Sequence, residues 1–452
     1  MSDFSEQAFL SKLSTLAKNN DPIDQSLYKT YDVKRGLRYS DGRGVLVGLT
    51  KIGDVSGYEV KDDKKIAVPG RLYYRGYNVE QLIADAEANR QFGFEQTTYL
   101  LIFGELPTKE QLDEFTQFLG SRRELPQFFT EDMIMKAPSP DIMNKLARGV
   151  LASYSYDKNP EDNSAENVIR QCIDLVARFP SLVSNAYQAK RRYYDGQSMY
   201  IHYSDPTVST AENFLRLIRP DAQYSRLEAE LLDLALILHA EHGGGNNSSF
   251  TVHVVSSADT DTYSAIAAGV GSLKGRRHGG ANIQVMKMMD GLKAGVKDWS
   301  NENQVKDYLR KIMRKEAGDG TGLVYGMGHA VYTISDPRAV QLRRKARELA
   351  VEKNCLEEFE LYCLIEKLTP DIFAEEHPTS TKRICANVDL YSGFIYSMLG
   401  IPRELFTPIF AISRIAGWSA HRIEEVVSDN RIYRPAYKNV LEPREYVPIN
   451  AR

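Results

Sequence analysis

The chain has 452 residues, 42% of them hydrophobic, which is enough for roughly three average domains or for one large helical body with an attachment. Fifty-seven basic residues against sixty acidic ones leave a formal net charge of −3, which argues against a dedicated nucleic-acid-binding protein. The four cysteines lie far apart with no C-x-x-C pair, which argues against a zinc ribbon or a disulfide scaffold.

The N-terminal twenty residues predict a short amphipathic helix, because Phe9, Leu13 and Leu16 recur at helical spacing. They contain Asp3 and Glu6 and lack a basic segment followed by an apolar one, unlike a transit or signal peptide. No apolar run approaches the roughly 20 residues that a membrane span needs. We therefore expect a soluble cytoplasmic protein.

The dominant hydrophobic period along the chain is helical, so the sequence predicts an all-α fold. Helices are expected at residues 80–89, 109–120, 140–155, 166–179, 211–219, 225–241, 262–274, 282–292, 303–316, 338–353, 355–366, 389–399 and 403–427.

Strand signals are confined to the first quarter of the chain, at 44–60 and 71–74, where apolar and polar residues alternate near glycines. The charge-rich stretch at about 293–388 has turn residues at both ends, which predicts a smaller helical unit inserted into a larger one. Residues 431–452 contain three prolines and are typical of an extended arm.

Histidines suggest where a site lies, since none of the eight precedes residue 202 and five fall within 239–329. The apolar segment 225–241 predicts a buried helix that ends in His239, Glu241 and His242 before three glycines. A polar tip on a buried helix needs partners. The H-x-x-H spacing allows a metal site, but it lacks the H-E-x-x-H order of zincins, and we expect no metal.

Two further histidines are framed by glycines and are hard to explain by packing. His278 lies in Gly-Arg-Arg-His-Gly-Gly, and His329 lies in Gly-Met-Gly-His ahead of Asp-Pro-Arg338. Glycine turns expose the ring that they carry. Asp389 begins the predicted helix at 389–399, either as a functional acid or as its N-cap. Arg414 lies among apolar residues, where a guanidinium needs a carboxylate or a phosphate.

From residue 70 to residue 435 the chain resembles the citrate synthase family. The specific matches are HAEHGGGNNSS (239–249), HGGAN (278–282), GMGHAVY (326–332) with DPR, and NVDLYSG (387–393), in the family's order and spacing. The resemblance implies a helical homodimer with a large domain at 1–280 and 390–452. A small domain at 281–389 would close over the active site, which agrees with the insertion predicted above.

The resemblance also implies the roles of individual residues. His278 and Asp389 are similar to the pair that enolises acetyl-CoA, and His329 is similar to the residue that hydrogen-bonds the oxaloacetate carbonyl. Four residues look like the groups that hold oxaloacetate: His242, Arg338, Arg414 and, contributed from the partner subunit, Arg434. Acetyl-CoA is then a co-substrate, and no permanently bound cofactor is expected.

Coenzyme A is expected near Gly326, Gly328 and Arg277. The chain departs from the family's pattern here, with Gly275-Arg276-Arg277 in place of Gly-Pro-Leu and Thr333 where many members have Arg or Lys. Arg276 and Arg277 are either phosphate contacts or a solvated basic turn.

The resemblance implies a citrate synthase, which condenses acetyl-CoA with oxaloacetate and water to give citrate and CoA through an enolate and citryl-CoA. The main alternative is a 2-methylcitrate synthase, which uses propionyl-CoA; one methylene changes binding by only roughly 1–3 kcal/mol. The remote alternative is a non-catalytic or metal-binding helical scaffold. Neither a nucleic acid nor a membrane is expected as a partner.

Overall fold

The computed structural model describes residues 5–39, 41–61, 64–380, 382–428 and 431–452. The chain forms two compact units, Met1–Leu49 and Thr50–Arg452. This division lies elsewhere than the boundary expected between a large domain and a small helical domain, which stays a prediction.

The first unit contains α1 (Glu6–Asn20), α2 (Gln25–Thr30) and the 3-10 turn η1 (Arg35–Leu37). The Ser5 side chain caps α1 by accepting the N–H of Ala8. The predicted N-terminal helix is therefore confirmed. Its apolar residues stay 44–55% exposed within the single chain.

The second unit contains a small antiparallel sheet, made by β1 (Gly53–Lys61), β2 (Lys64–Tyr74) and β3 (Tyr77–Asn78). Gly53 pairs with Tyr74, and the register shifts between Ser56 and Tyr58. The Tyr74 hydroxyl donates to the carbonyls of Ile237 and Glu241, at 2.9 and 3.2 Å. The sheet thus contacts the C-terminal end of the buried helix that carries the first histidines.

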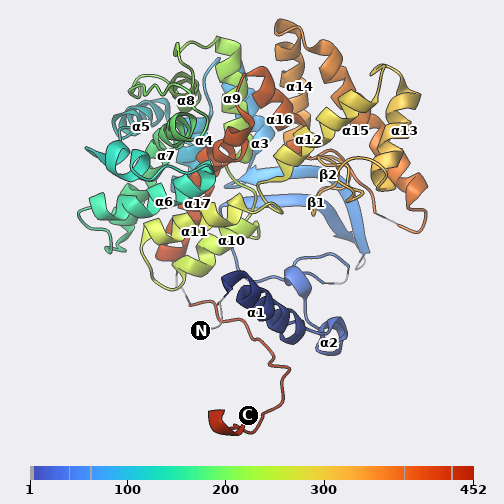
Figure 1. Ribbon diagram of the computed structural model, residues 1–452. Helices are drawn as coiled ribbons and strands as arrows, with labels where there is room; N and C mark the ends of the chain where they lie inside the picture. Colours follow the sequence, from blue (N-terminus) through green and yellow to red (C-terminus); the bar gives the residue numbers. More distant parts are fainter. Residues whose placement is uncertain (1–4, 40, 62–63, 381, 429–430) are drawn as a thin grey trace. The chain divides into compact units, whose positions relative to one another are not determined.

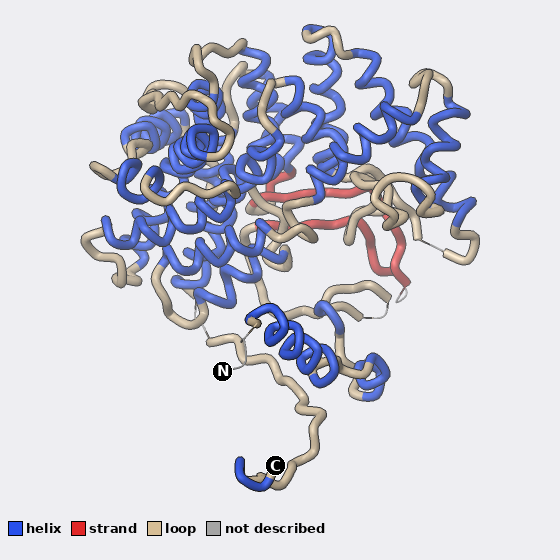
Figure 2. Tube along the Cα trace, in the orientation of Figure 1, coloured by secondary structure: helices blue, strands red, loops and turns tan. Residues whose placement is uncertain are grey.

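Helices make up most of this unit (Figure 2). Their bounds are α3 (Val79–Ala88), α4 (Phe94–Phe103), α5 (Lys109–Ser121), η2 (Thr130–Met135), α6 (Ile142–Ser153), η3 (Tyr154–Tyr156), α7 (Ala165–Tyr193), α8 (Thr210–Ile218), α9 (Arg226–His239), α10 (Asn247–Ser256), α11 (Thr262–Lys274), α12 (Ala281–Gly295), α13 (Glu302–Met313), α14 (Pro337–Glu352), α15 (Leu356–Glu376), α16 (Val388–Met398), η4 (Arg403–Leu405), α17 (Phe406–Val427) and η5 (Ile449–Ala451).

The buried helix α17 packs against α4, α7, α9, α10 and α11, and it carries the predicted Arg414 (Figure 1). In a second group, α14 packs on α15 and α16, and α12 packs on α16. The segment at 331–335 runs along the sheet, where Ser335 O accepts the N–H of Gly70 at 3.1 Å. The sheet therefore contacts the end of α9, which lies next to His242, and the segment that follows His329.

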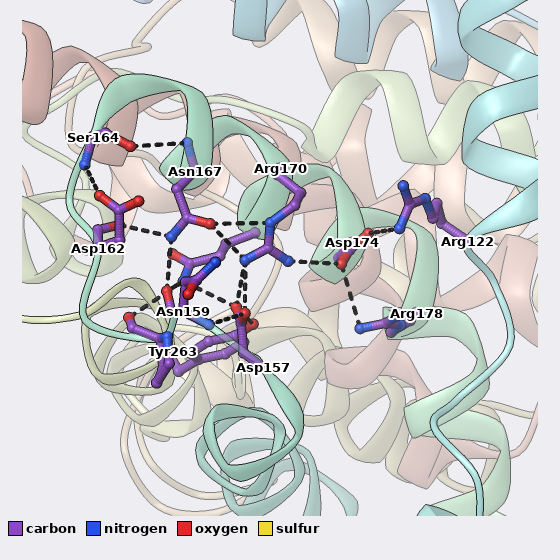
Figure 3. A network of polar contacts seen from close by, with 12 residues as sticks. Arg122, Asp157, Asn159, Asp162, Ser164, Asn167, Arg170, Asp174, Arg178 and Tyr263 are labelled. Atoms are coloured by element: carbon purple, nitrogen blue, oxygen red, sulfur yellow. Dashed lines mark hydrogen bonds and ion pairs between the residues drawn. The ribbon is translucent and has the colours of Figure 1, made fainter.

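The longest helix, α7, is held at its start by a polar network (Figure 3). The Arg170 guanidinium donates to both carboxylate oxygens of Asp157 at 2.7 Å. Asp157 also accepts the Tyr263 hydroxyl at 2.7 Å, which links the loop before α7 to α11. On the next turn of α7, Asp174 lies 3.5–3.6 Å from Arg122, Arg170 and Arg178.

Most predicted helices are confirmed within a few residues at each end, but several parts of the prediction were wrong. The segment 44–60 is a strand only from Gly53 onward, and the strand predicted at 71–74 begins at Lys64. The helices α2 and α4 were not predicted, and no bounds were predicted for α10. α7 continues through Pro180 although its prediction stopped at residue 179, and α15 continues to Glu376 although its prediction stopped at residue 366. The C-terminal arm is extended apart from η5, as predicted. Among the described residues, no helix is both long and apolar enough to cross a membrane.

Candidate active site

The first part of the site is the turn that follows α9. His239 ends the helix and is fully buried, and its ring stacks on Phe410 of α17 with the ring centroids 4.3 Å apart. His242 is partly buried, and its Nε2 has no hydrogen-bond partner among the described residues. The positive φ of Gly243, 82°, turns the chain between this histidine and α10.

The second part is the turn between α11 and α12, which carries His278. The backbone N–H of His278 donates to Gly275 O, and that of Gly279 donates to Leu273 O. A Cβ at Gly279 would lie 2.3 Å from that carbonyl oxygen, so only glycine fits directly after His278. The His278 Nε2 lies 3.0 Å from the Ser248 hydroxyl, which itself accepts the Trp418 indole N–H at 3.1 Å.

The third part is the glycine loop at 326–329, which lies against the start of α16. The N–H of Asn387 donates to Gly326 O and its side-chain amide donates to Gly328 O, both at 2.8 Å. Gly326 has a φ of 81°, and a Cβ there would lie 2.9 Å from Cα of Leu390. These contacts bring the loop that ends in His329 to the helix that begins with Val388 and Asp389.

Asn387, not Asp389, caps α16, because its side chain accepts the N–H of Asp389 at 3.0 Å. The alternative interpretation of Asp389 as the N-cap residue is therefore wrong. Burial raises the pKa of Asp389 from 3.8 to about 6, against the opposing effect of Arg338. At neutral pH this side chain is a carboxylate that is unusually ready to accept a proton.

Two buried arginines approach these groups. Arg338 forms a bidentate pair with Asp336, through Nε at 3.0 Å and Nη2 at 2.8 Å. Asp336 also caps α14, and Pro337 occupies the first helical position. Although burial alone would lower it, the Asp336 carboxylate raises the pKa of Arg338.

Arg414 is completely buried on α17 and donates from Nε to His239 O at 2.6 Å. Its Nη1 and Nη2 have no hydrogen-bond partner in the described part of the chain. Burial lowers its pKa to about 10, so it stays charged at neutral pH. A buried charge of this kind is expensive unless an anion pairs with it.

Electrostatic interactions join these parts into one site. The pKa of His242 is depressed by burial and by the charges of Arg338 and Arg414. Burial and Arg414 lower the pKa of His278 to about 4. The rings of His242 and His329 pack edge to face with their centroids 5.2 Å apart, and the His329 ring stacks on Tyr332 with the centroids 4.7 Å apart.

The structure therefore groups His242, His278, His329, Arg338, Asp389 and Arg414, six of the residues that the sequence predicted. Such a site offers two permanent positive charges, neutral imidazoles and one basic carboxylate. It suits a small dianion and a proton transfer next to it.

The other predicted residues lie differently. Arg434 is exposed on the C-terminal arm, and Arg277 is exposed in the turn before His278. Gly326 and Gly328 hold the His329 loop against α16, as described above. Their proposed contacts with coenzyme A stay predictions, as does the placement of Arg434 in a partner's site.

Sequence reasoning did not identify which contacts position the predicted residues. Ser248 contacts His278, Asp336 pairs with Arg338, and Glu241 lies 3.1 Å from the buried His421. For Asp336 a signal was present, because Asp-Pro at the start of a predicted helix is typical of an N-cap followed by its first residue.

The model of the citrate synthase C-terminal domain matches residues 37–436 of the chain. The chain is 33% identical over 426 residues to the citrate synthase of Haloferax volcanii, an alignment that covers 93% of this chain and 99% of that protein. It is also 33% identical over 386 residues to the 2-methylcitrate synthase of Shewanella oneidensis, with 84% of this chain and 92% of that protein covered.

Solved structures agree with these similarities. The citrate synthase of Pyrobaculum aerophilum superposes with a TM-score of 0.73 at 29% identity, covering 90% of this chain and 94% of that one. A ternary complex of carboxymethyl coenzyme A and oxaloacetate with the Thermoplasma acidophilum citrate synthase gives a TM-score of 0.74 at 25% identity, over 93% and 99% of the two chains.

Proposed function

The chain belongs to the citrate synthase family, and on that premise we propose that it condenses acetyl-CoA with oxaloacetate and water to give citrate and CoA. In this reaction the acyl group becomes an alkyl group on transfer, so the enzyme is an acyltransferase. The observation that carries the proposal is the pair of buried arginines beside neutral histidines. Arg414 in particular keeps two guanidinium nitrogens without a partner among the described residues.

The two arginines suit the two carboxylates of oxaloacetate, because a guanidinium pairs with a carboxylate through two parallel hydrogen bonds. His242 and His329 lie between the segments that carry the arginines, and the low pKa of His242 keeps its ring neutral. A neutral imidazole can donate one hydrogen bond without adding charge. We assign His329 to the ketone oxygen of oxaloacetate and His242 to its binding.

Asp389 is the proposed base that removes a proton from the acetyl methyl group. An ordinary aspartate, with a pKa near 4, is a weak base for a carbon acid. Burial brings the pKa of Asp389 to about 6, closer to the working pH at which a base is most effective. The carbanion still needs stabilisation as it forms, and a positioned donor to the enolate oxygen contributes roughly 3–4 kcal/mol.

His278 is the proposed donor to that oxygen, and Ser248 selects its tautomer. The Trp418 indole can only donate, so the Ser248 oxygen accepts there and keeps its single proton for another acceptor. That acceptor is either Nε2 of His278 at 3.0 Å or the Asn246 amide oxygen at 2.9 Å. When Ser248 donates to Nε2, the proton of the neutral ring lies on Nδ1, and Nδ1 donates to the enolate.

Several parts of the proposal rest on the family resemblance. The active enzyme is a cytoplasmic homodimer, in which Arg434 of each extended arm enters the partner's oxaloacetate site. The domain at 281–389 closes over the bound substrates and keeps water from the enolate until citryl-CoA has formed. Coenzyme A lies near Gly326, Gly328 and Arg277, and no permanently bound cofactor takes part.

Steady-state rates with oxaloacetate and either acetyl-CoA or propionyl-CoA test the substrate. We expect a higher kcat/KM for acetyl-CoA, with citrate as the product. The similarity to a 2-methylcitrate synthase makes propionyl-CoA the second candidate. A preference for propionyl-CoA would change the proposed acyl substrate and leave the proposed mechanism as it is. Turnover of neither thioester would refute the proposal.

A further inference from the structure

A second buried group of titratable side chains, which the proposed reaction does not use, joins α10 to α17. His253 Nε2 and His421 Nδ1 face each other at 2.9 Å. Glu424, three residues after His421, places Oε2 3.8 Å from the same Nδ1. These three ligand atoms lie within 4.8 Å of one another. We call His253, His421 and Glu424 the inner triad.

The outer nitrogen of each ring faces a carboxylate. His253 Nδ1 lies 2.7 Å from Glu425 Oε2, and His421 Nε2 lies 3.1 Å from Glu241 Oε1. The first contact is a hydrogen bond of the kind that metal-binding histidines make, in which the second ring nitrogen donates to a carboxylate and fixes the tautomer. The second is a close contact without hydrogen-bond geometry. With both outer nitrogens protonated, each inner nitrogen presents a lone pair. Two lone pairs 2.9 Å apart repel unless a cation lies next to both.

The charges of the surroundings also call for a cation. Three carboxylates, those of Glu241, Glu424 and Glu425, surround two imidazoles whose side chains are 0–8% exposed. Glu424 Oε1 accepts the N–H of Lys51 at 2.7 Å, whereas its Oε2 is buried without a hydrogen-bond partner in the described segments. Arg414, Arg75 and Arg422 offset part of this negative charge, and a cation bound inside the triad would offset more of it.

We propose that the inner triad binds one divalent transition-metal ion of the zinc class, through two imidazole nitrogens and one carboxylate oxygen. Two histidines and one glutamate form a known zinc ligand set. Nitrogen ligands favour zinc and its neighbours over Mg²⁺ and Ca²⁺, which prefer oxygen. The inference is independent of the H-x-x-H pair His239 and His242, and it departs from the expectation of a metal-free protein.

The ion would anchor the oxaloacetate pocket from outside. Glu241 connects the inner triad to the pocket, because its Oε1 lies 3.1 Å from His421 Nε2 and the next residue in the chain is His242. Holding His421 fixes Glu241, which lies two residues after the end of α9 and directly precedes His242. The triad thereby becomes a set of positioning residues, and none of its members touches the substrate.

The test uses the full-length, untagged protein. It is unfolded with chelator, refolded with or without ZnCl2 and passed through gel filtration, since an ion reaches a buried site most readily during folding. Zinc per chain is then measured by mass spectrometry, and the thermal midpoint is measured with zinc, with MgCl2 and with neither. The variants are His253→Gln and Glu424→Gln, and the matched control is His377→Gln, which removes an exposed histidine at the end of α15.

We expect about one zinc per chain in the wild type and in His377→Gln, with a raised thermal midpoint for zinc but not for magnesium. Both triad variants should bind zinc at least roughly tenfold more weakly. Should a variant fail to fold, anomalous scattering at the zinc edge from wild-type crystals locates the ion directly. Wild-type protein without zinc, or zinc retained by both folded variants, would overturn the proposal. The two rings would then share a proton.

Discussion

Replacing Asp389 by Asn should abolish most activity and at the same time stabilise the protein at neutral pH. The carboxylate pKa is raised by burial from 3.8 to about 6. Because one pKa unit corresponds to 1.36 kcal/mol, ionised Asp389 costs the folded state about 3 kcal/mol above pH 6. Partial exposure reduces this, and removing a negative charge from the first turn of α16 costs roughly 0.3–1 kcal/mol. The net gain for Asp389→Asn is then about 1–2 kcal/mol.

The pH dependence of the stability difference follows from the raised pKa of Asp389. Between pH 4 and pH 6 the folded state binds more protons at this site than the unfolded state does, so the wild type loses stability as pH rises through that window. About half of the penalty is already present at pH 5, and all of it above pH 6–7. The advantage of the Asn variant should therefore grow between pH 5 and pH 7.5. Turnover should fall by a factor on the order of 10² to 10⁴, with exchange of the acetyl methyl protons stopped.

Urea unfolding of both proteins at pH 5 and pH 7.5 measures the difference. The control is Asp113→Asn, which removes an exposed carboxylate from α5 and should change stability by less than about 0.5 kcal/mol. If the Asp389→Asn protein were no more stable at pH 7.5 than at pH 5 relative to the wild type, the burial argument would fail. Near-normal methyl exchange in the variant would show that Asp389 is not the base.

Three further outcomes follow from the same geometry. Ser248→Ala should lower kcat by roughly 10- to 100-fold with the oxaloacetate KM almost unchanged, because it removes the group that selects the His278 tautomer. An oxaloacetate KM that rises by the same factor as kcat falls would contradict this role. The acidic limb of the pH profile should lie near pH 6 in kcat/KM and at higher pH in kcat, and coincident limbs would count against Asp389 as the titrating group. Arg434→Ala and His278→Ala subunits, each inactive alone, should partly regain activity when mixed after dissociation; no recovery despite proven exchange would rule out a shared site.

The local parts of the site were predictable from the sequence, whereas its long-range partners were not. Glycines around His278 and before His329 indicate turns, because the backbone there requires glycine. Ser248 and His421 acquire their roles from residues 30 and 180 positions away along the chain. Local sequence patterns do not predict contacts between residues so far apart in the chain.

The errors in the fold have similar causes. In α4 the residues TTYLLIF are β-branched, aromatic or apolar and read equally well as a strand, but burial against α9 and α17 makes them helical. Pro180 ends a helix by local rules at a cost of about 3 kcal/mol. In α7 it lies among residues that are buried on every side, and this packing outweighs the lost hydrogen bond.

The charges around the site explain why its histidines stay neutral and why the acid limb should move. Arg338 is paired with Asp336, and Arg414 is partly compensated by Glu241. A dianion then adds two negative charges beside Asp389, which raises the pKa of that carboxylate further in the complex. Binding of the dianion thereby makes Asp389 a stronger base before the thioester is deprotonated.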